Sequence, residues 1–168
     1  VYDAYRRFIQ LFGKVALGIP DEEFDAEFET IKNKVGVTVD LGLSAKALKD
    51  VSERFLQVVK RVTGMPFTED TFVKLEIAIK AVFNSWDVKR AVDYRREINS
   101  TLDMANGTAV NVGAMVFGNL GDDSATGVGF TRYPDTGANE LFGEYLVNAQ
   151  GEDVVAGIRT PKPIDAML

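Results

Sequence analysis

The hydrophobic periodicity of this chain changes at Asn106–Gly107, and this change limits what the chain can fold into. Before it, apolar residues recur every three or four positions, which predicts amphipathic helices. After it, short apolar runs are interrupted by glycines. We therefore predict an α+β chain, with a bundle-like helical part over residues 1–106 and a β-rich part over residues 107–168. Glycine lets a backbone approach a ligand closely, so the second part is where we look for function.

Five helices are predicted in the first part. Gly18, Gly36 and Gly64 are expected to end the first three, and Ser44 is a suitable N-cap for the third. Thr68 is the predicted N-cap of the fourth helix, and residues 88–98 form the fifth. The apolar stripe of the fourth helix is predicted to face inward: Phe72, Leu75, Ala78, Ile79 and Val82. These stripes can bury one another without any ligand.

Three strands are predicted in the second part. Residues 109–117 are apolar throughout, as in a strand buried on both faces. Residues 128–131 and 141–147 are the other two, and residues 133–137 have the Pro, Asp and Gly composition of a turn. A further short apolar run at residues 154–158 follows a polar turn at residues 150–153.

Composition excludes several classes of function. The chain has 19 basic and 25 acidic residues, a net charge of -6, and no cluster of Lys and Arg, so a nucleic-acid partner is not predicted. Its apolar runs are too short to span a membrane, and no secretory signal is visible. The chain has no histidine and no cysteine, which excludes thiolate, Ser-His-Asp and His-rich metal chemistry. Carboxylates remain as metal ligands, which favours Mg or Ca.

Acidic residues near apolar strand positions are the first candidates for a site. Glu144, Glu152 and Asp153 need a partner or a metal if they face the interior, and Arg159 is the nearest basic candidate. The alternative is an ion pair in solvent at a strand edge, which stabilises a fold little. A second acidic stretch at residues 122–127 lacks the ligand spacing of an EF-hand, so a solvated hairpin tip is the better interpretation.

Several motifs resemble the nucleotide-binding region of pyruvate, phosphate dikinases. In the β-rich part these are GTAVNV (107–112), MVFGN (115–119), GDDS (121–124), TGVGFTR (126–132), GEYL (143–146), NAQGEDVVAG (148–157) and RTP (159–161). In the helical part they are YDAYRRFIQ (2–10), SWD (85–87) and YRR (94–96). The resemblance therefore spans the whole chain.

The resemblance implies part of an ATP-grasp domain of an enzyme that converts ATP, phosphate and pyruvate to AMP, pyrophosphate and phosphoenolpyruvate. It implies ATP and Mg as ligands of the parent enzyme, a swinging phosphohistidine domain as partner, and a homodimeric parent in the cytoplasm, a plastid or a glycosome. The chain starts at Val1 without a Met, so we expect an internal piece of something longer that is inactive alone. The family's ATP-contacting Lys and Arg lie before it, and the metal-binding acids lie after it.

The matching motifs also imply which residues face the nucleotide. A strand over Gly113, Ala114, Met115 and Val116 matches the segment that runs past the adenine, although Gly113 stands where the family usually has Gln. Residues matching the phosphate side are Glu144, Gln150, Glu152, Asp153 and Arg159. They could instead form a buried network that holds strands together.

A competing prediction assigns a different role to the helical part. It would be an interaction or dimerisation module of a related dikinase, of the phosphoenolpyruvate synthase or glucan type, with no nucleotide binding of its own. An apolar surface beyond what the bundle buries would favour this alternative.

Overall fold

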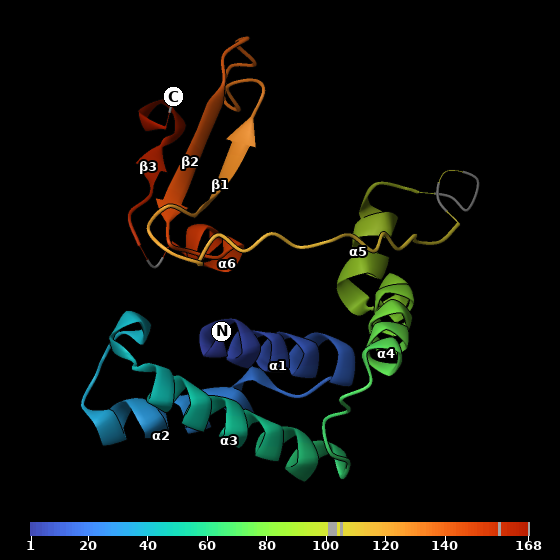
Figure 1. The fold of residues 1–168 in the computed structure, drawn as a ribbon. Coiled ribbons are helices and arrows are strands. Elements are labelled where there is room, and N and C mark those ends of the chain that lie inside the picture. The colour runs from blue at the N-terminus through green and yellow to red at the C-terminus, as the bar shows by residue number, and fades with distance from the viewer. Residues whose placement is uncertain (101–103, 105, 158, 168) are drawn as a thin grey trace. The chain divides into compact units, whose positions relative to one another are not determined.

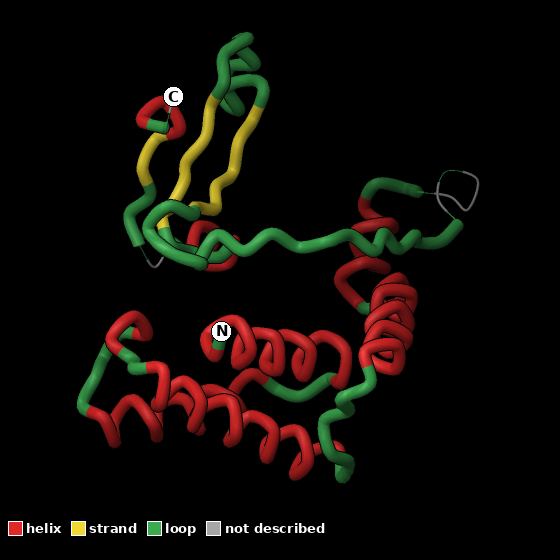
Figure 2. Tube along the Cα trace, viewed as in Figure 1, coloured by secondary structure: helices red, strands yellow, loops and turns green. Residues whose placement is uncertain are grey.

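A computed structural model describes residues 1–100, 104, 106–157 and 159–167 of the chain (Figure 1). These residues form two compact units, Val1–Asn111 and Val112–Leu168, and each unit is described by itself. The first is helical and the second carries the sheet (Figure 2). The predicted α+β class is confirmed. Within the described ranges, no helix has the length and apolar character needed to cross a membrane.

The described residues of the first unit form five α-helices and two short 3-10 helices. These are α1 (Tyr2–Leu17), α2 (Asp21–Val35), η1 (Asp40–Gly42), α3 (Ala45–Thr63), α4 (Thr71–Asn84), η2 (Ser85–Asp87) and α5 (Lys89–Glu97). The predicted ends of α1, α2 and α3 are confirmed: Gly18, Gly36 and Gly64 follow them with φ of 69°, 73° and 75°, a left-handed conformation that glycine adopts at low cost. The Ser44 side chain accepts a hydrogen bond from the backbone N–H of Ala47, as its predicted capping role requires.

The hydrophobic core of this unit lies between α1, α2 and α3. Phe55 of α3 is completely buried and packs edge-on against Phe24 and Phe28 of α2, with ring centroids 5.1 and 6.2 Å apart. Ile9 of α1 belongs to the same cluster. Arg6 is buried beside this core, where it pairs with Asp3 and Asp40 and stacks on the Phe28 ring.

Helix α4 differs from the prediction in its start and in its burial. Asp70, not Thr68, is the N-cap, because its carboxylate accepts hydrogen bonds from the N–H groups of Phe72 and Val73. No residue of α4, all of which the structure describes, is buried, and Phe72 is 83% exposed. The helix is apolar, but its main described contact is with α1, which covers only part of its surface.

The second unit is a three-stranded antiparallel sheet in the order β1–β2–β3. Its strands are β1 (Ala125–Phe130), β2 (Phe142–Val147) and the short β3 (Lys162–Pro163). The register pairs Thr126 with Leu146 and Gly129 with Gly143. The turn predicted at residues 133–137 is confirmed by a hydrogen bond from Gly137 N–H to the Tyr133 carbonyl, 2.8 Å long.

Two predictions for the β-rich part of the chain are wrong. Residues 109–117 form no described strand, and Met115 and Val116 are 67% and 92% exposed rather than buried. A strand requires a neighbouring ladder, and none of the described strands pairs with this segment. The acids at 152 and 153 lie on the short helix α6 (Gly151–Val155), not beside a strand, because Gln150 and Asp153 form a capping box that starts a helix there. The last element in the described residues is the 3-10 helix η3 (Ile164–Ala166).

Candidate functional site

The predicted site residues form two groups in the second unit. The first group lies on and after β2, and the second lies on the segment before β1. Glu144 lies on β2, Gln150, Glu152 and Asp153 lie at or on α6, and Arg159 follows it. The structure thus brings the C-terminal end of β2, α6 and Arg159 together at one end of the sheet. Gly113, Ala114, Met115 and Val116 lie on the exposed segment before this region.

The centre of the first group is a turn from Val147 to Gln150. Asn148 has a φ of 49°, which is uncommon for a residue with a side chain. Its backbone N–H donates to the Ser124 carbonyl at 2.8 Å, and the N–H of Ala149 donates to the Gly118 carbonyl at 2.9 Å. Ala149 is almost completely buried. Because both amides are bonded to the loop before β1, the turn has a defined position against that loop.

Gln150 and Asp153 fix the start of α6. The Gln150 N–H donates to Asp153 Oδ2 at 2.9 Å, and the Gln150 side chain accepts from the Asp153 N–H. The Gln150 Nε2 also donates to Asn119 Oδ1 at 3.3 Å. These bonds account for the polar groups of Gln150 within the protein, so its position is determined by the fold.

Arg159 contacts backbone rather than the carboxylates that the sequence suggested. Its Nη2 donates to the Val147 carbonyl at 3.0 Å, and its Nη1 donates to the Asn148 carbonyl at 3.2 Å. The positive φ of Asn148 turns two successive carbonyls toward the guanidinium fork. This geometry could not be read from the spacing of charged residues.

Glu144 lies on β2, the central strand of the sheet. Its register partners are Val128 on β1 and Pro163 on β3, and its side chain is exposed. Phe142 on the same strand packs against Phe130 and Tyr133, with ring centroids 6.2 and 4.9 Å away. Glu144 is therefore a solvated carboxylate next to an aromatic surface, which leaves it available to a ligand.

Three residues that contact this turn were not predicted: Gly118, Asn119 and Thr126. A Cβ on Gly118 would overlap Thr126 Oγ1 and lie 2.5 Å from the Ala149 carbonyl oxygen, so only glycine fits. Thr126 Oγ1 donates to that same carbonyl at 2.8 Å. The glycine after an apolar run was visible in the sequence, but the crowding arises from residues that are distant along the chain.

The acidic residues of the described ranges do not gather in groups of three or more that could hold a metal ion. The Asp122 carboxylate instead accepts a hydrogen bond from the Asn148 side chain at 3.4 Å. The hairpin-tip interpretation of residues 122–127 is wrong in part: residues 122–124 lie in the turn before β1, but residues 125–127 belong to β1 itself.

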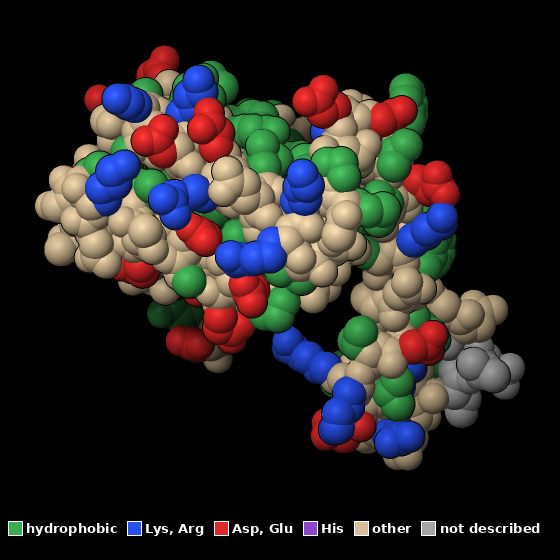
Figure 3. All heavy atoms as spheres, turned by 90° about the horizontal axis from the view of Figure 1, so that it is seen from below, with side chains coloured by type: hydrophobic (Ala, Val, Ile, Leu, Met, Phe, Trp, Pro, Cys, Tyr) green, Lys and Arg blue, Asp and Glu red, His purple; other side chains and the backbone are tan. Residues whose placement is uncertain are grey.

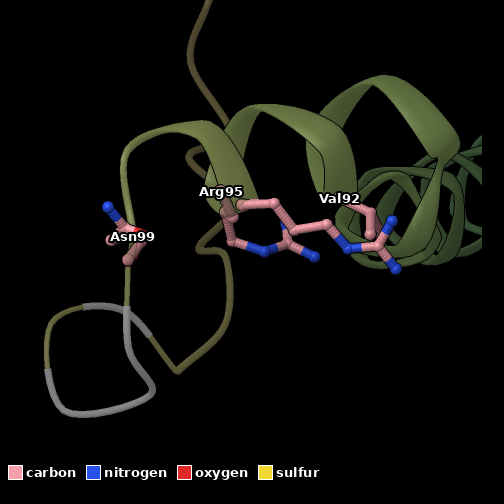
Figure 4. A pocket seen from close by; sticks show the side chains of 5 residues that line it. Val92, Arg95 and Asn99 are labelled. Carbon is pink, nitrogen blue, oxygen red and sulfur yellow. The ribbon is translucent and has the colours of Figure 1, made fainter.

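An open hollow in the helical unit involves none of the predicted residues. It is lined by Val92, Arg95, Arg96, Asn99 and Ser100 at the end of α5 (Figure 4). The Arg95 guanidinium lies 4.0 Å from the centre of the Trp86 ring and stacks on it, so the protein itself covers part of the guanidinium. On the molecular face drawn in Figure 3, basic and acidic side chains are interspersed with apolar ones.

Comparison with known proteins assigns the family. Residues 16–166 match the family described as pyruvate phosphate dikinase, AMP/ATP-binding domain. The chain belongs to this family. The matched range includes α2 to α5, the sheet and the turn at Asn148.

Curated relatives are pyruvate, phosphate dikinases from distant organisms. The chain is 55% identical to the protein of Entamoeba histolytica over 166 residues, which is 99% of this chain and 19% of that protein. It is 52% identical to the chloroplastic protein 1 of Arabidopsis thaliana and 50% identical to that of Zea mays, in each case over 99% of this chain and 17% of the relative. The chain thus spans about one-fifth of the length of these dikinases.

Proposed function

We propose that this chain forms one wall of the ATP site of a pyruvate, phosphate dikinase. The parent enzyme would convert ATP, phosphate and pyruvate to AMP, pyrophosphate and phosphoenolpyruvate. The observation that carries the proposal is the match of residues 16–166 to the AMP/ATP-binding domain of this family. The ordered polar turn at Asn148 supports it, because nucleotide sites need polar groups held in place by the fold.

Each group of site residues has a proposed role. The backbone N–H and C=O groups from Gly113 to Val116 would bond the edge of the adenine, and the apolar side chains would cover its face. The exposure of Met115 and Val116 supports this role, since both side chains are accessible. Glu144, Gln150, Glu152 and Asp153 would line or brace the phosphate side.

Magnesium is proposed as a ligand of the parent enzyme, where it would offset the charge of the phosphates. No three acidic residues within the described ranges cluster at a possible metal site, so a magnesium ion held here would take most of its ligands from the phosphates and from other parts of the parent enzyme. The proposed phosphoryl acceptor is a histidine on a mobile domain. The chain contains no histidine, so that partner domain would contribute the acceptor. We therefore expect the isolated chain not to turn over.

The parent enzyme is proposed to be a homodimer in the cytoplasm, with a plastid as the alternative compartment. The names of the Arabidopsis and maize relatives state that those proteins are chloroplastic. Fractionation of cells that express the full-length protein would decide between these compartments.

Calorimetric titration with Mg·ATP tests the nucleotide proposal. The full-length dikinase that contains this sequence should bind ATP, and Gly113→Gln should tighten binding because it restores a polar side chain near the base. Gly113→Ala, which replaces the same glycine without adding a polar side chain, is the control for a non-specific effect of the substitution. If Gly113→Gln and Glu144→Gln both leave the ATP affinity unchanged, this wall does not face the nucleotide.

A second function is favoured by the surface of α4. Phe72 is 83% exposed and Phe83 is 51% exposed, so this helix carries an apolar surface beyond what the bundle buries. The helical unit would then be an interaction or dimerisation module. Sedimentation velocity of the 168-residue chain tests this: self-association that Phe72→Ser and Phe83→Ser abolish would support it, and a monomer at all concentrations would count against self-association.

A further inference from the structure

The turn from Val147 to Gln150 has a bonded partner for every backbone carbonyl. Arg159 binds the carbonyls of Val147 and Asn148, and Thr126 Oγ1 binds that of Ala149. The Gln150 carbonyl accepts from the Asp153 N–H at 3.0 Å. Arg159 and Thr126 thus hold three successive carbonyls, and they belong to different parts of the chain.

The turn benefits from such support because its conformation is uncommon. Asn148 has a φ of 49°, a region that asparagine tolerates better than most residues with side chains, and the bonds to its neighbours stabilise that conformation further. Arginine suits the role because its guanidinium presents several N–H groups in one rigid plane. Two nitrogen atoms of that plane reach two neighbouring carbonyls at 3.0 and 3.2 Å.

We propose that Arg159 is a positioning residue of the nucleotide site and does not bind the phosphates itself. It holds the turn, and the turn places Gln150 and the acids of α6. Thr126 acts on the same turn from β1. This inference rests on the proposed function for its consequence in ATP binding, whereas the effect on the turn can be measured independently of it.

The test compares three substitutions with a matched control. Arg159→Gln removes both bonds, Arg159→Lys keeps the charge but loses the planar fork, and Thr126→Val removes the bond to Ala149. The control is Arg132→Gln, because Arg132 Nη1 also donates to a backbone carbonyl, that of Gly137, at 3.0 Å in the hairpin turn far from Asn148. Two readouts are taken: hydrogen exchange of the Asn148 and Ala149 amides, and KM for ATP and kcat of the full-length dikinase.

A positioning role predicts that both readouts change together. Arg159→Gln should accelerate exchange of the two amides at least roughly tenfold, since the opened turn exposes them. It should raise KM for ATP by about tenfold, because misplaced binding groups lose affinity. Thr126→Val should have a smaller effect of the same kind, about threefold. Arg159→Lys should restore part of the loss, and Arg132→Gln should change neither readout.

Other outcomes overturn the inference in distinguishable ways. If KM for ATP rises while amide exchange stays unchanged, Arg159 contacts the nucleotide directly. If exchange accelerates and only kcat and thermal stability fall, Arg159 has a merely structural role. If substitutions of Gly113 and Glu144 also leave the ATP affinity unchanged, the proposed function fails, and the exchange data still show whether Arg159 holds the turn.

Discussion

The two units of this chain are stabilised in different ways. In Val1–Asn111, buried aromatic and aliphatic side chains from α1, α2 and α3 form one continuous cluster. In Val112–Leu168, only three hydrophobic residues of the described part are buried: Tyr145, Leu146 and Ala149. This second unit depends instead on backbone pairing and on side chains that bind backbone carbonyls, such as Arg159 and Thr126.

This difference has a consequence for function. A hydrophobic core tolerates substitutions that keep volume and apolar character, because the interaction has no direction. A bonded turn tolerates few substitutions, because each hydrogen bond requires one donor in one place. The part proposed to face ATP therefore has the stricter geometric requirements, and the helical part can provide stability with many different sequences.

The largest predicted effect tests the core of the helical unit. Phe55→Ala should lower the free energy of unfolding by about 3–5 kcal/mol, because Phe55 is completely buried between Phe24 and Phe28. Urea unfolding followed by circular dichroism measures this loss. Phe72→Ala is the matched control and should change stability by less than about 0.5 kcal/mol, since Phe72 is 83% exposed. If the NMR signals of folded β1 and β2 also disappear in Phe55→Ala, the sheet unit depends on the helical unit for its stability.

The next effect tests the sheet unit. Gly118→Ala should lower stability of this unit by roughly 1–3 kcal/mol, because the added methyl group would overlap Thr126 and approach the Ala149 carbonyl. The NMR signals of Asn148 and Ala149 should shift most. Gly113→Ala is the control. A Cβ added at Gly113 would have no atom within 4 Å, so the stability of the sheet unit should be unchanged or slightly raised. If both variants lose the same stability, the loss does not come from crowding around Gly118.

A smaller effect tests where α4 begins. Asp70→Ala should destabilise α4 by about 1 kcal/mol, because Asp70 bonds two N–H groups of the first turn. Amide exchange of Phe72 and Val73 reports this directly. Thr68→Ala should have the weaker effect, since Thr68 Oγ1 accepts only from the Asp70 N–H, at 3.2 Å. The reverse order would support the N-cap expected from the sequence.

The smallest effect concerns pH in the helical unit. Burial, together with nearby Asp21 and Glu22, raises the pKa of the Asp25 carboxyl above its ordinary value of 3.8. The folded chain then binds more protons than the unfolded chain just above pH 3.8, so this group lowers stability as pH rises through that window. Asp25→Asn should therefore raise the melting temperature at pH 7 slightly, by an amount equivalent to less than about 0.5 kcal/mol, and not at pH 3. A lower melting temperature at pH 7 would contradict this sign.

Local features of the fold could be predicted from the sequence, and nonlocal ones could not. Gly18, Gly36 and Gly64 end helices because the left-handed conformation is a property of the residue itself. The exposure of Phe72 depends on which neighbours cover α4, and the apolar pattern of the helix does not contain that information. The stretch from Val112 to Val116 has the composition of a strand, but composition does not supply a pairing partner.

The candidate site shows the same limit. The motif around Asn148 identified the region, and the family match includes it. The partners of Arg159 were not predictable, because they are carbonyls exposed by the positive φ of Asn148. Gly118 and Thr126 contribute through contacts with Ala149, more than 20 positions away along the sequence. Their importance becomes visible only when the turn and the strand are placed side by side.

The exposed segment from Val112 to Val116 also matters for proteolysis. Proteases cut most readily where the chain is accessible and outside regular structure. A protease selective for apolar residues should therefore cleave beside Met115 or Val116, which are 67% and 92% exposed, before it cleaves within α3. If Mg·ATP lies along this segment, its presence should slow that first cut. The rate of this first cleavage, measured with and without Mg·ATP, then reports whether nucleotide reaches this part of the chain.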